Sequence, residues 1–153
     1  MMIKELQMKE IKRSIKIEAP VNNVFEYASN YRNWPEFFEG VSDVKSLAET
    51  TRGDGSKFIY KVKILGMNFT VGTEFREFRE NEGWRGKSFK GIEHRTQWIF
   101  KQANGNTEFT FIQGYKYPWY LGGKFVDNKF VYPSWIKIIE NSLQNVKRIL
   151  EAK

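Results

Sequence analysis

A single histidine, His94, is the residue in this sequence best suited to move protons near neutral pH. Its ordinary pKa of about 6.5 would let it act as a general acid or base, and Tyr115 is a second candidate for proton transfer. Two-residue alternation puts His94 on the same strand face as Thr96 and Trp98, toward the interior. A structural histidine, hydrogen-bonded or half exposed after the turn at Gly91, is the simpler interpretation of the same position.

Other polar side chains fall on inward strand positions between aromatic neighbours: Tyr60, Thr73, Ser88, Gln113, Tyr115 and Tyr117. A buried hydroxyl or amide without a partner costs about 1–3 kcal/mol. These groups must therefore bond to one another, to water or to a ligand. A few polar groups inside an apolar pocket are typical of a small-molecule site.

Composition argues against several kinds of catalytic site. The chain has no cysteine, which removes disulfides, thiolate zinc sites and cysteine nucleophiles, and one histidine argues against a multi-histidine metal site. The glutamates of segments 26–39 and 74–80 show no pair forced together, and no glycine-rich phosphate loop or Ser-His-Asp set is present. We therefore expect neither a metal nor a cofactor.

Without an apolar stretch approaching about 20 residues, the 153-residue chain is expected to be one soluble, cytoplasmic domain.

The elements that would position these residues follow from hydrophobic periodicity. Residues 11–18 alternate as a half-buried strand, and Pro20 opens an amphipathic helix that ends at Asn30. A second short helix begins near Trp34. From about 41 to 117, alternation indicates an antiparallel meander, with hairpin turns at "DG" (54–55) and "NG" (104–105) and a bulge near 76–77.

The C-terminal segment changes to helical periodicity. Apolar residues recur at steps of three and four in "SWIKIIENSLQNVKRIL", which predicts an amphipathic helix covering the sheet. The preceding segment, 122–133, is expected to be helical and interrupted by a kink at Pro133. The order is thus a strand, two short helices, about six strands and a long helix, an α+β arrangement with about seven antiparallel strands.

A curved sheet around one long helix leaves space between them, and the inner face of this sheet is rich in aromatic residues. The chain contains 13 Phe, 7 Tyr and 5 Trp, whereas such a space is ordinarily filled by Leu, Ile and Val. Flat walls around a flat or elongated apolar guest would explain the excess of rings. Besides the polar residues above, the candidate wall consists of Trp34, Phe38, Phe58, Phe69, Val71, Trp84, Thr96, Trp98, Phe109, Phe111, Trp135, Ile139 and Leu143.

The opening and closing segments resemble a known family. "IKIEAPVNNVFEYASNYRNWPEFFEGV" is similar to the start of the START/Bet v 1-like (SRPBCC) superfamily, in particular its polyketide cyclase/dehydrase-like branch. "LGGKFVDNKFVYPSWIKIIENSLQNVKRILE" resembles the closing helix, with Gly-Gly before it, a mid-segment proline and a final Lys147-x-x-x-Glu151. The resemblance implies the helix-grip fold and a hydrophobic ligand cavity. It implies no particular ligand, because members range from lipid carriers to cyclases and hormone receptors.

The net charge of +7 raises the question of an anionic partner. Cationic side chains fall on outward strand positions, at Lys57, Lys61, Lys63, Arg76, Arg85, Lys87, Arg95 and Lys116. Nucleic-acid-binding sheets carry stacking aromatics on the same face as the charges, and here the two are separated, which argues against nucleic acid. The stretch "YPWYLGGKF" (117–125) could form an entrance lid or a tip that touches a membrane.

Three functions are consistent with these features. The first is binding of a small hydrophobic molecule, such as a lipid, a polyketide or another aromatic compound, for storage, transport or sensing. The second is a cyclase- or aromatase-like enzyme that uses His94 or Tyr115. The third is an interaction module that docks through the basic outer face. Nothing in the sequence indicates an oligomeric state.

Overall fold

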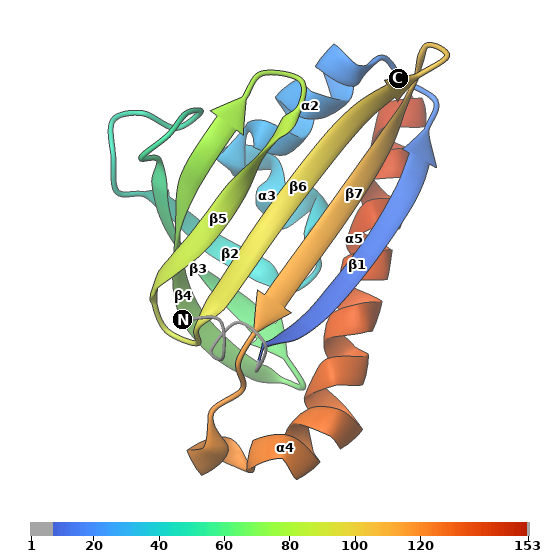
Figure 1. The fold of residues 1–153 in the computed structure, drawn as a ribbon. Helices are drawn as coiled ribbons and strands as arrows, with labels where there is room; N and C mark the ends of the chain where they lie inside the picture. Colours follow the sequence, from blue (N-terminus) through green and yellow to red (C-terminus); the bar gives the residue numbers. More distant parts are fainter. Residues whose placement is uncertain (1–7, 153) are drawn as a thin grey trace.

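The computed structural model describes residues 8–152 and shows a curved antiparallel sheet wrapped around a long C-terminal helix (Figure 1). The elements are β1 (Lys9–Ile17), α2 (Val21–Ser29), η1 (Tyr31–Asn33), α3 (Trp34–Phe37), β2 (Val41–Ser46), β3 (Lys57–Ile64), β4 (Met67–Arg79), β5 (Gly83–Lys90), β6 (His94–Ala103), β7 (Asn106–Tyr115), η2 (Trp119–Leu121), α4 (Gly123–Val126), η3 (Asp127–Val131) and α5 (Tyr132–Glu151). This architecture confirms the expected α+β helix-grip fold.

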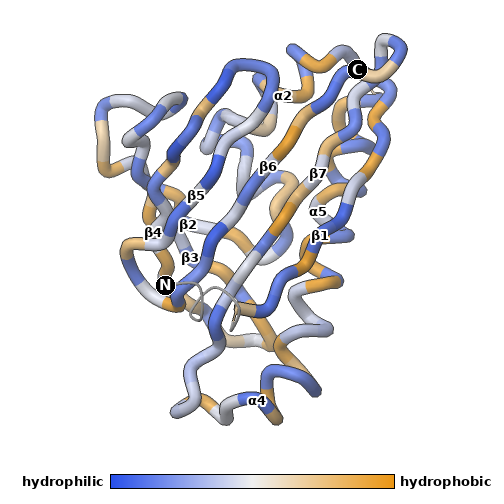
Figure 2. The backbone as a smooth tube through the Cα atoms, in the orientation of Figure 1, coloured by the Kyte–Doolittle hydropathy of each residue, from blue (hydrophilic) through white to orange (hydrophobic). Residues whose placement is uncertain are grey.

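The sheet has seven strands in the order β1-β7-β6-β5-β4-β3-β2. Strands β2 to β7 pair with their neighbours along the chain, whereas β1 crosses to pair with β7, with Ile11 opposite Gln113. Hydrophilic and hydrophobic residues alternate along the strands (Figure 2), so one face is turned to solvent and the other to α5. The periodicity in the sequence therefore determined which side chains face the interior.

Tight turns fix the register of the meander. Leu65–Gly66 joins β3 to β4 and Asn104–Gly105 joins β6 to β7, and all four residues have positive φ, as type I′ hairpin turns require. The "DG" pair at 54–55 lies in a longer loop, residues 47–56, between the paired strands β2 and β3. The bulge expected near 76–77 is confirmed by a shift in the β4–β5 register after Arg76.

The long helix accommodates Pro133 without a break. The chain is helical from Gly123 to Glu151, but the turn just before the proline, Asp127–Val131, is a π-helix. A proline cannot donate a backbone hydrogen bond, and its ring crowds the carbonyl four residues earlier, so a wider turn relieves the conflict. The interruption expected at Pro133 is therefore a π-helical turn. No helix in residues 8–152 is both long and apolar enough to cross a membrane.

One half of the interior, beneath α2 and α3, is filled by aromatic rings. The Trp98 ring lies 4.9–6.1 Å, centroid to centroid, from the rings of Trp34, Phe37, Phe38, Trp84, Phe109 and Phe111. Trp34 Nε1 donates a 2.9 Å hydrogen bond to the carbonyl of Ala28, which holds the indole against α2. The aromatic residues that follow β1 in the sequence, including Phe25, Tyr27, Trp34 and Phe37, are thus part of the packed core.

Candidate functional site

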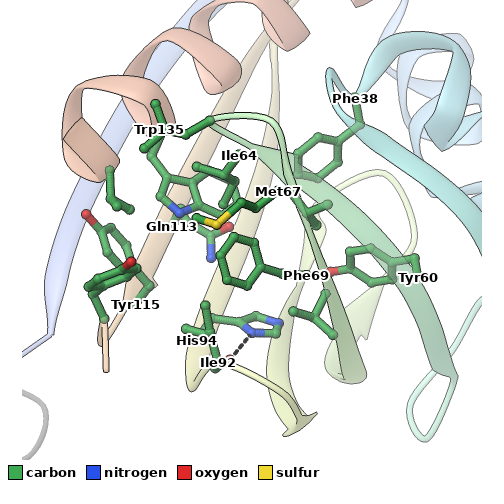
Figure 3. Close-up of a pocket in the computed structure, with 15 residues that line it drawn as sticks. Phe38, Tyr60, Ile64, Met67, Phe69, Ile92, His94, Gln113, Tyr115 and Trp135 are labelled. Carbon is green, nitrogen blue, oxygen red and sulfur yellow. Dashed lines mark hydrogen bonds between the residues drawn. The ribbon is translucent and has the colours of Figure 1, made fainter. Parts of the chain in front are cut away.

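A cavity lies in the other half of the interior, between the sheet and the beginning of α5 (Figure 3). Its walls come from α3–β2, the β3–β4 hairpin, the start of β6, the end of β7 and the η3–α5 junction. The lining residues are Phe38, Tyr60, Val62, Ile64, Leu65, Met67, Phe69, Val71, Ile92, His94, Gln113, Tyr115, Tyr117, Val131 and Trp135. None of them is a lysine, arginine, aspartate or glutamate, so the site has no formal charge while His94 is neutral.

The structure brings part of the sequence-derived candidate set to this cavity. Nine candidates line it: Phe38, Tyr60, Phe69, Val71, His94, Gln113, Tyr115, Tyr117 and Trp135. Six other candidates, Trp34, Phe58, Trp84, Trp98, Phe109 and Phe111, are buried in the aromatic core, and Ile139 and Leu143 are buried on α5. Strand parity correctly indicates the inner face but does not distinguish the half that is packed from the half that is hollow.

Of the three remaining candidates, Thr73 and Ser88 lie next to the cavity wall, and Thr96 lies away from it. Thr73 and Ser88 make hydrogen bonds to His94, through the ring and the backbone N–H respectively. Thr96 stands opposite Gly86, where its hydroxyl takes up the space that a side chain on that glycine would need.

Six wall residues were not among the candidates: Val62, Ile64, Leu65, Met67, Ile92 and Val131. Val62 and Ile64 share the alternation of β3 with Tyr60, and Met67 shares that of β4 with Phe69, so periodicity could have found them. Ile92 lies in a turn and Val131 in the π-helical turn, and neither position carries a periodic signal.

His94 is held in one orientation by hydrogen bonds at both ring nitrogens. Nδ1 lies 2.8 Å from the Ile92 carbonyl, which can only accept, so Nδ1 carries the proton. Nε2 of the neutral ring then accepts from Thr73 Oγ1 at 2.7 Å, and Thr73 in turn accepts from the Tyr60 hydroxyl at 2.9 Å. Burial lowers the pKa of His94, since the charged ring would lose its hydration, and burial likewise raises the pKa of Tyr60 to about 12.

Two buried polar groups at the cavity lack good partners. The Gln113 side chain is 2% exposed, and its Nε2 makes one long bond of 3.4 Å to the Gly114 carbonyl. Trp135 is 9% exposed. Among the residues that the structure describes, no hydrogen bond joins Gln113 Oε1 or Trp135 Nε1 to another protein group, and neither atom is completely shielded from the cavity space. Figure 3 shows the Gln113 amide and Trp135 among the side chains that line the cavity.

Tyr115 connects the cavity wall to the π-helical turn. Its ring faces the cavity, and its hydroxyl donates a 2.5 Å hydrogen bond to Asp127 Oδ1, which is also buried. Burial and the nearby carboxylate both raise the pKa of Tyr115. Lys9 Nζ lies 4.0 Å from the second oxygen of Asp127. Tyr115 thus holds the start of the long helix against the sheet.

The cavity is small in this structure, and half-exposed, adaptable side chains line it on the side of the β3–β4 turn. Its volume is about 30 Å³, room for no more than a few water molecules. Leu65 and Met67 at the β3–β4 turn are 49% and 50% exposed while they line it, so the cavity reaches solvent there. Met67 is unbranched and adaptable. A ligand larger than a few atoms has to displace these side chains.

The outer face of the sheet is basic, as expected, but several of its cations are paired. Lys61 lies 3.2 Å from Asp43, and Arg85 lies 3.0 Å from Glu77. Surface pairs of this kind stabilise a protein little, and they reduce the charge that an external anion would meet.

The fold and cavity define the class of protein. A seven-stranded antiparallel sheet around a long C-terminal helix is the helix-grip architecture of the hydrophobic-ligand-binding SRPBCC superfamily. The sequence matches the family described as polyketide cyclase / dehydrase and lipid transport over residues 8–151, and the chain belongs to that family. No curated protein sequence matches it significantly.

Solved structures share the fold at low sequence identity. The Zhui aromatase/cyclase from Streptomyces sp. R1128 superimposes with a TM-score of 0.80 at 12% identity, covering 94% of each chain. TTHA0849 from Thermus thermophilus gives 0.79 at 17% identity, covering 94% of this chain and 98% of that one. Ginseng major latex-like protein 151 from Panax ginseng gives 0.72 at 11% identity, with 94% and 98% covered.

Proposed function

We propose that this protein binds a small, uncharged hydrophobic molecule that carries one polar group, for storage, transport or sensing. The molecule occupies the space between the β3–β4 hairpin and the beginning of α5. The observation that carries the proposal is the pair of unpartnered polar atoms, Gln113 Oε1 and Trp135 Nε1, in a cavity whose other polar side chains are hydrogen-bonded. A ligand group that both donates and accepts hydrogen bonds, such as a hydroxyl, would satisfy both atoms.

The absence of charge on the cavity wall supports a neutral ligand. A carboxylate or ammonium placed there would lose its hydration without meeting an opposite charge among the fifteen lining residues. The apolar part of the ligand would gain about 25 cal/mol for each Å² removed from water. That gain offsets the cost of moving Leu65 and Met67, which are already half exposed.

The test is displacement of a neutral fluorescent probe, N-phenyl-1-naphthylamine, by two molecules of equal chain length. We expect 1-dodecanol to displace the probe at least about tenfold more effectively than dodecanoate, because only the alcohol enters the cavity without a charge. Equal displacement by both would contradict a neutral site. Failure of the probe and of both competitors to bind would contradict the proposal as a whole.

A cyclase- or dehydratase-type enzyme is the second candidate, because neutral His94 lies on the cavity wall. Its Nε2 is occupied by Thr73, so proton transfer to a substrate would first require that hydrogen bond to break. A carrier with His94→Ala should still bind its ligand and release it unchanged. An enzyme should convert a bound compound in the wild type and lose that conversion in the variant.

A further inference from the structure

We propose that the tip formed by η2 and α4, together with the following turn, docks on an anionic lipid membrane and brings the cavity mouth to its surface. This inference concerns a surface outside the cavity and stands without the ligand proposed above. It rests on exposed aromatic residues, on their accompanying lysines and on the position of the tip.

The tip exposes large apolar side chains to an unusual degree. Trp119 is 84% exposed, Tyr120 70% and Phe125 67%, and Phe130 and Leu121 are 46% and 40% exposed. Among the described residues, no other large hydrophobic side chain is as exposed as the first three. Exposed apolar groups gathered in one segment mark an interaction surface, whereas single ones scattered over a protein do not.

The charges around these rings are positive. Lys116, Lys124 and Lys129 are exposed, and the Lys129 ammonium lies 5.6 Å from the centre of the Phe125 ring. The only acidic residue between positions 116 and 136 is Asp127, which is buried and bonded to Tyr115. The solvent-facing part of this segment therefore combines aromatic groups with cations and contains no exposed carboxylate of its own.

This combination fits a lipid surface better than a protein partner. Trp and Tyr prefer the zone between lipid headgroups and acyl chains, where the ring is apolar and its polar edge stays hydrated. Lysines can rest their stems along apolar groups while the ammonium reaches anionic headgroups. The tip also projects past the end of the sheet (Figure 1), a convex shape that can enter a soft headgroup layer.

The tip is connected to the cavity wall. Tyr117, which lines the cavity, donates a 3.0 Å hydrogen bond from its hydroxyl to the Leu121 carbonyl. Val131, at the end of the same segment, also lines the cavity. A tip resting on a membrane therefore places the part of the cavity wall formed by Tyr117 and Val131 near the lipid, which shortens the path of an apolar guest through water.

The fluorescence of Trp119 can report contact of the tip with a membrane. Trp119 is exposed, whereas the other four tryptophans, Trp34, Trp84, Trp98 and Trp135, are buried. The full chain is mixed with vesicles of phosphatidylcholine alone or of phosphatidylcholine with phosphatidylglycerol, and pelleting and tryptophan emission are measured. We expect binding that requires phosphatidylglycerol, weakens with salt and shifts emission to the blue. Lipids brominated on the acyl chain should quench this emission in the wild type and not in Trp119→Phe.

Two sets of variants separate the contributions. Trp119→Ala with Phe125→Ala should lower the vesicle partition coefficient at least about tenfold. Replacing Lys116, Lys124 and Lys129 by Gln should lower it about fivefold for each lysine. The matched controls are Leu47→Ala, at the most exposed large apolar side chain outside the tip among the described residues (55%), and Lys45→Gln with Lys101→Gln, exposed lysines elsewhere. Both controls should bind nearly as the wild type does, after correction for net charge.

Three results would overturn the proposal. The first is absence of binding to phosphatidylglycerol vesicles at low salt. The second is binding that the double aromatic variant retains in full. The third is a self-associated form, seen by sedimentation, that is lost on Trp119→Ala with Phe125→Ala while vesicles are not bound, which would assign the tip to a second copy of the chain.

Discussion

At the scale of single residues, His94 is the most constrained polar group of the cavity wall. Protonation of its Nε2 would turn an acceptor into a donor and force Thr73 to reverse its hydrogen bond. It would also place a charge in a site that burial keeps nearly free of water. His94 is therefore expected to stay neutral in the folded protein at pH values where it is charged in the unfolded chain.

This difference makes stability depend on pH. Because the pKa of His94 is lower in the folded state than its unfolded value of about 6.5, the unfolded state binds the proton more readily. The free energy of unfolding should hold above pH 6.5 and fall as the pH drops toward the folded pKa, by at most about 1.4 kcal/mol per pH unit. Urea unfolding at pH 7.5 and pH 5.5 measures it.

His94→Gln is the control for this prediction. It retains hydrogen-bonding capacity and removes the only histidine, so its unfolding free energy should change less over the same range. Equal pH sensitivity of the variant and the wild type would assign the effect to other groups.

Strand parity was enough to predict that Tyr60, His94 and Gln113 face the interior. The sequence could not show that Gln113 would have only one long hydrogen bond while both ring nitrogens of His94 would be bonded, because that depends on groups brought together by the fold. Nor could it show that Ile92 would supply the carbonyl that fixes the histidine ring, since Ile92 lies in an irregular turn.

At the scale of elements, the hydrogen bond from Tyr115 on β7 to Asp127 in the π-helical turn is the contact that we expect to be most sensitive to mutation. Tyr115→Phe removes the donor to Asp127 and leaves a buried carboxylate with Lys9 at 4.0 Å as its nearest cation. We expect the free energy of unfolding to fall by about 1–3 kcal/mol, with faster hydrogen exchange in residues 123–131. Chemical denaturation and exchange mass spectrometry measure the two effects.

Tyr117→Phe is the matched control, because its hydroxyl bonds to the Leu121 carbonyl in an exposed position. Its cost should stay below about 0.5 kcal/mol. If both variants cost the same, Tyr115 would not be the link that holds the helix start.

The element order and the hairpin turns could be predicted because each has a local signal, in periodicity or in a Gly-containing dipeptide. The π-helical turn could not. Pro133 indicates a disturbance of the helix, but whether the chain breaks, kinks or widens there depends on how Asp127 and Val131 pack against β7 and the cavity.

At the scale of the whole molecule, stability and binding occupy different halves of one interior. Rings beneath α2 and α3 pack edge-to-face and at tilted angles, and they include most of the buried aromatic residues of the described chain. The other half has aliphatic side chains near the β3–β4 turn, of which Leu65 and the unbranched Met67 are about half exposed. A rigid half can thus hold the sheet in shape while the other half opens for a guest.

The sequence predicted this shape through its resemblance to the superfamily but did not separate the two halves. Hydrophobic residues alternate in the same way at both ends of each strand. The position of α2 and α3 decides which half of the interior is packed with side chains and which half contains the cavity. This is why Trp98 and Phe109 were candidates for the cavity wall and lie in the core.

Native mass spectrometry of the full chain, purified from cells without detergent, tests the central claim most directly. The account predicts a non-covalent, one-to-one adduct that organic extraction identifies as neutral and apolar with a hydroxyl or amide group. Gln113→Leu should carry markedly less of it while remaining folded, since the variant removes only one weakly bonded amide. A wild-type protein that carries no adduct and takes up neither 1-dodecanol nor N-phenyl-1-naphthylamine would contradict the account.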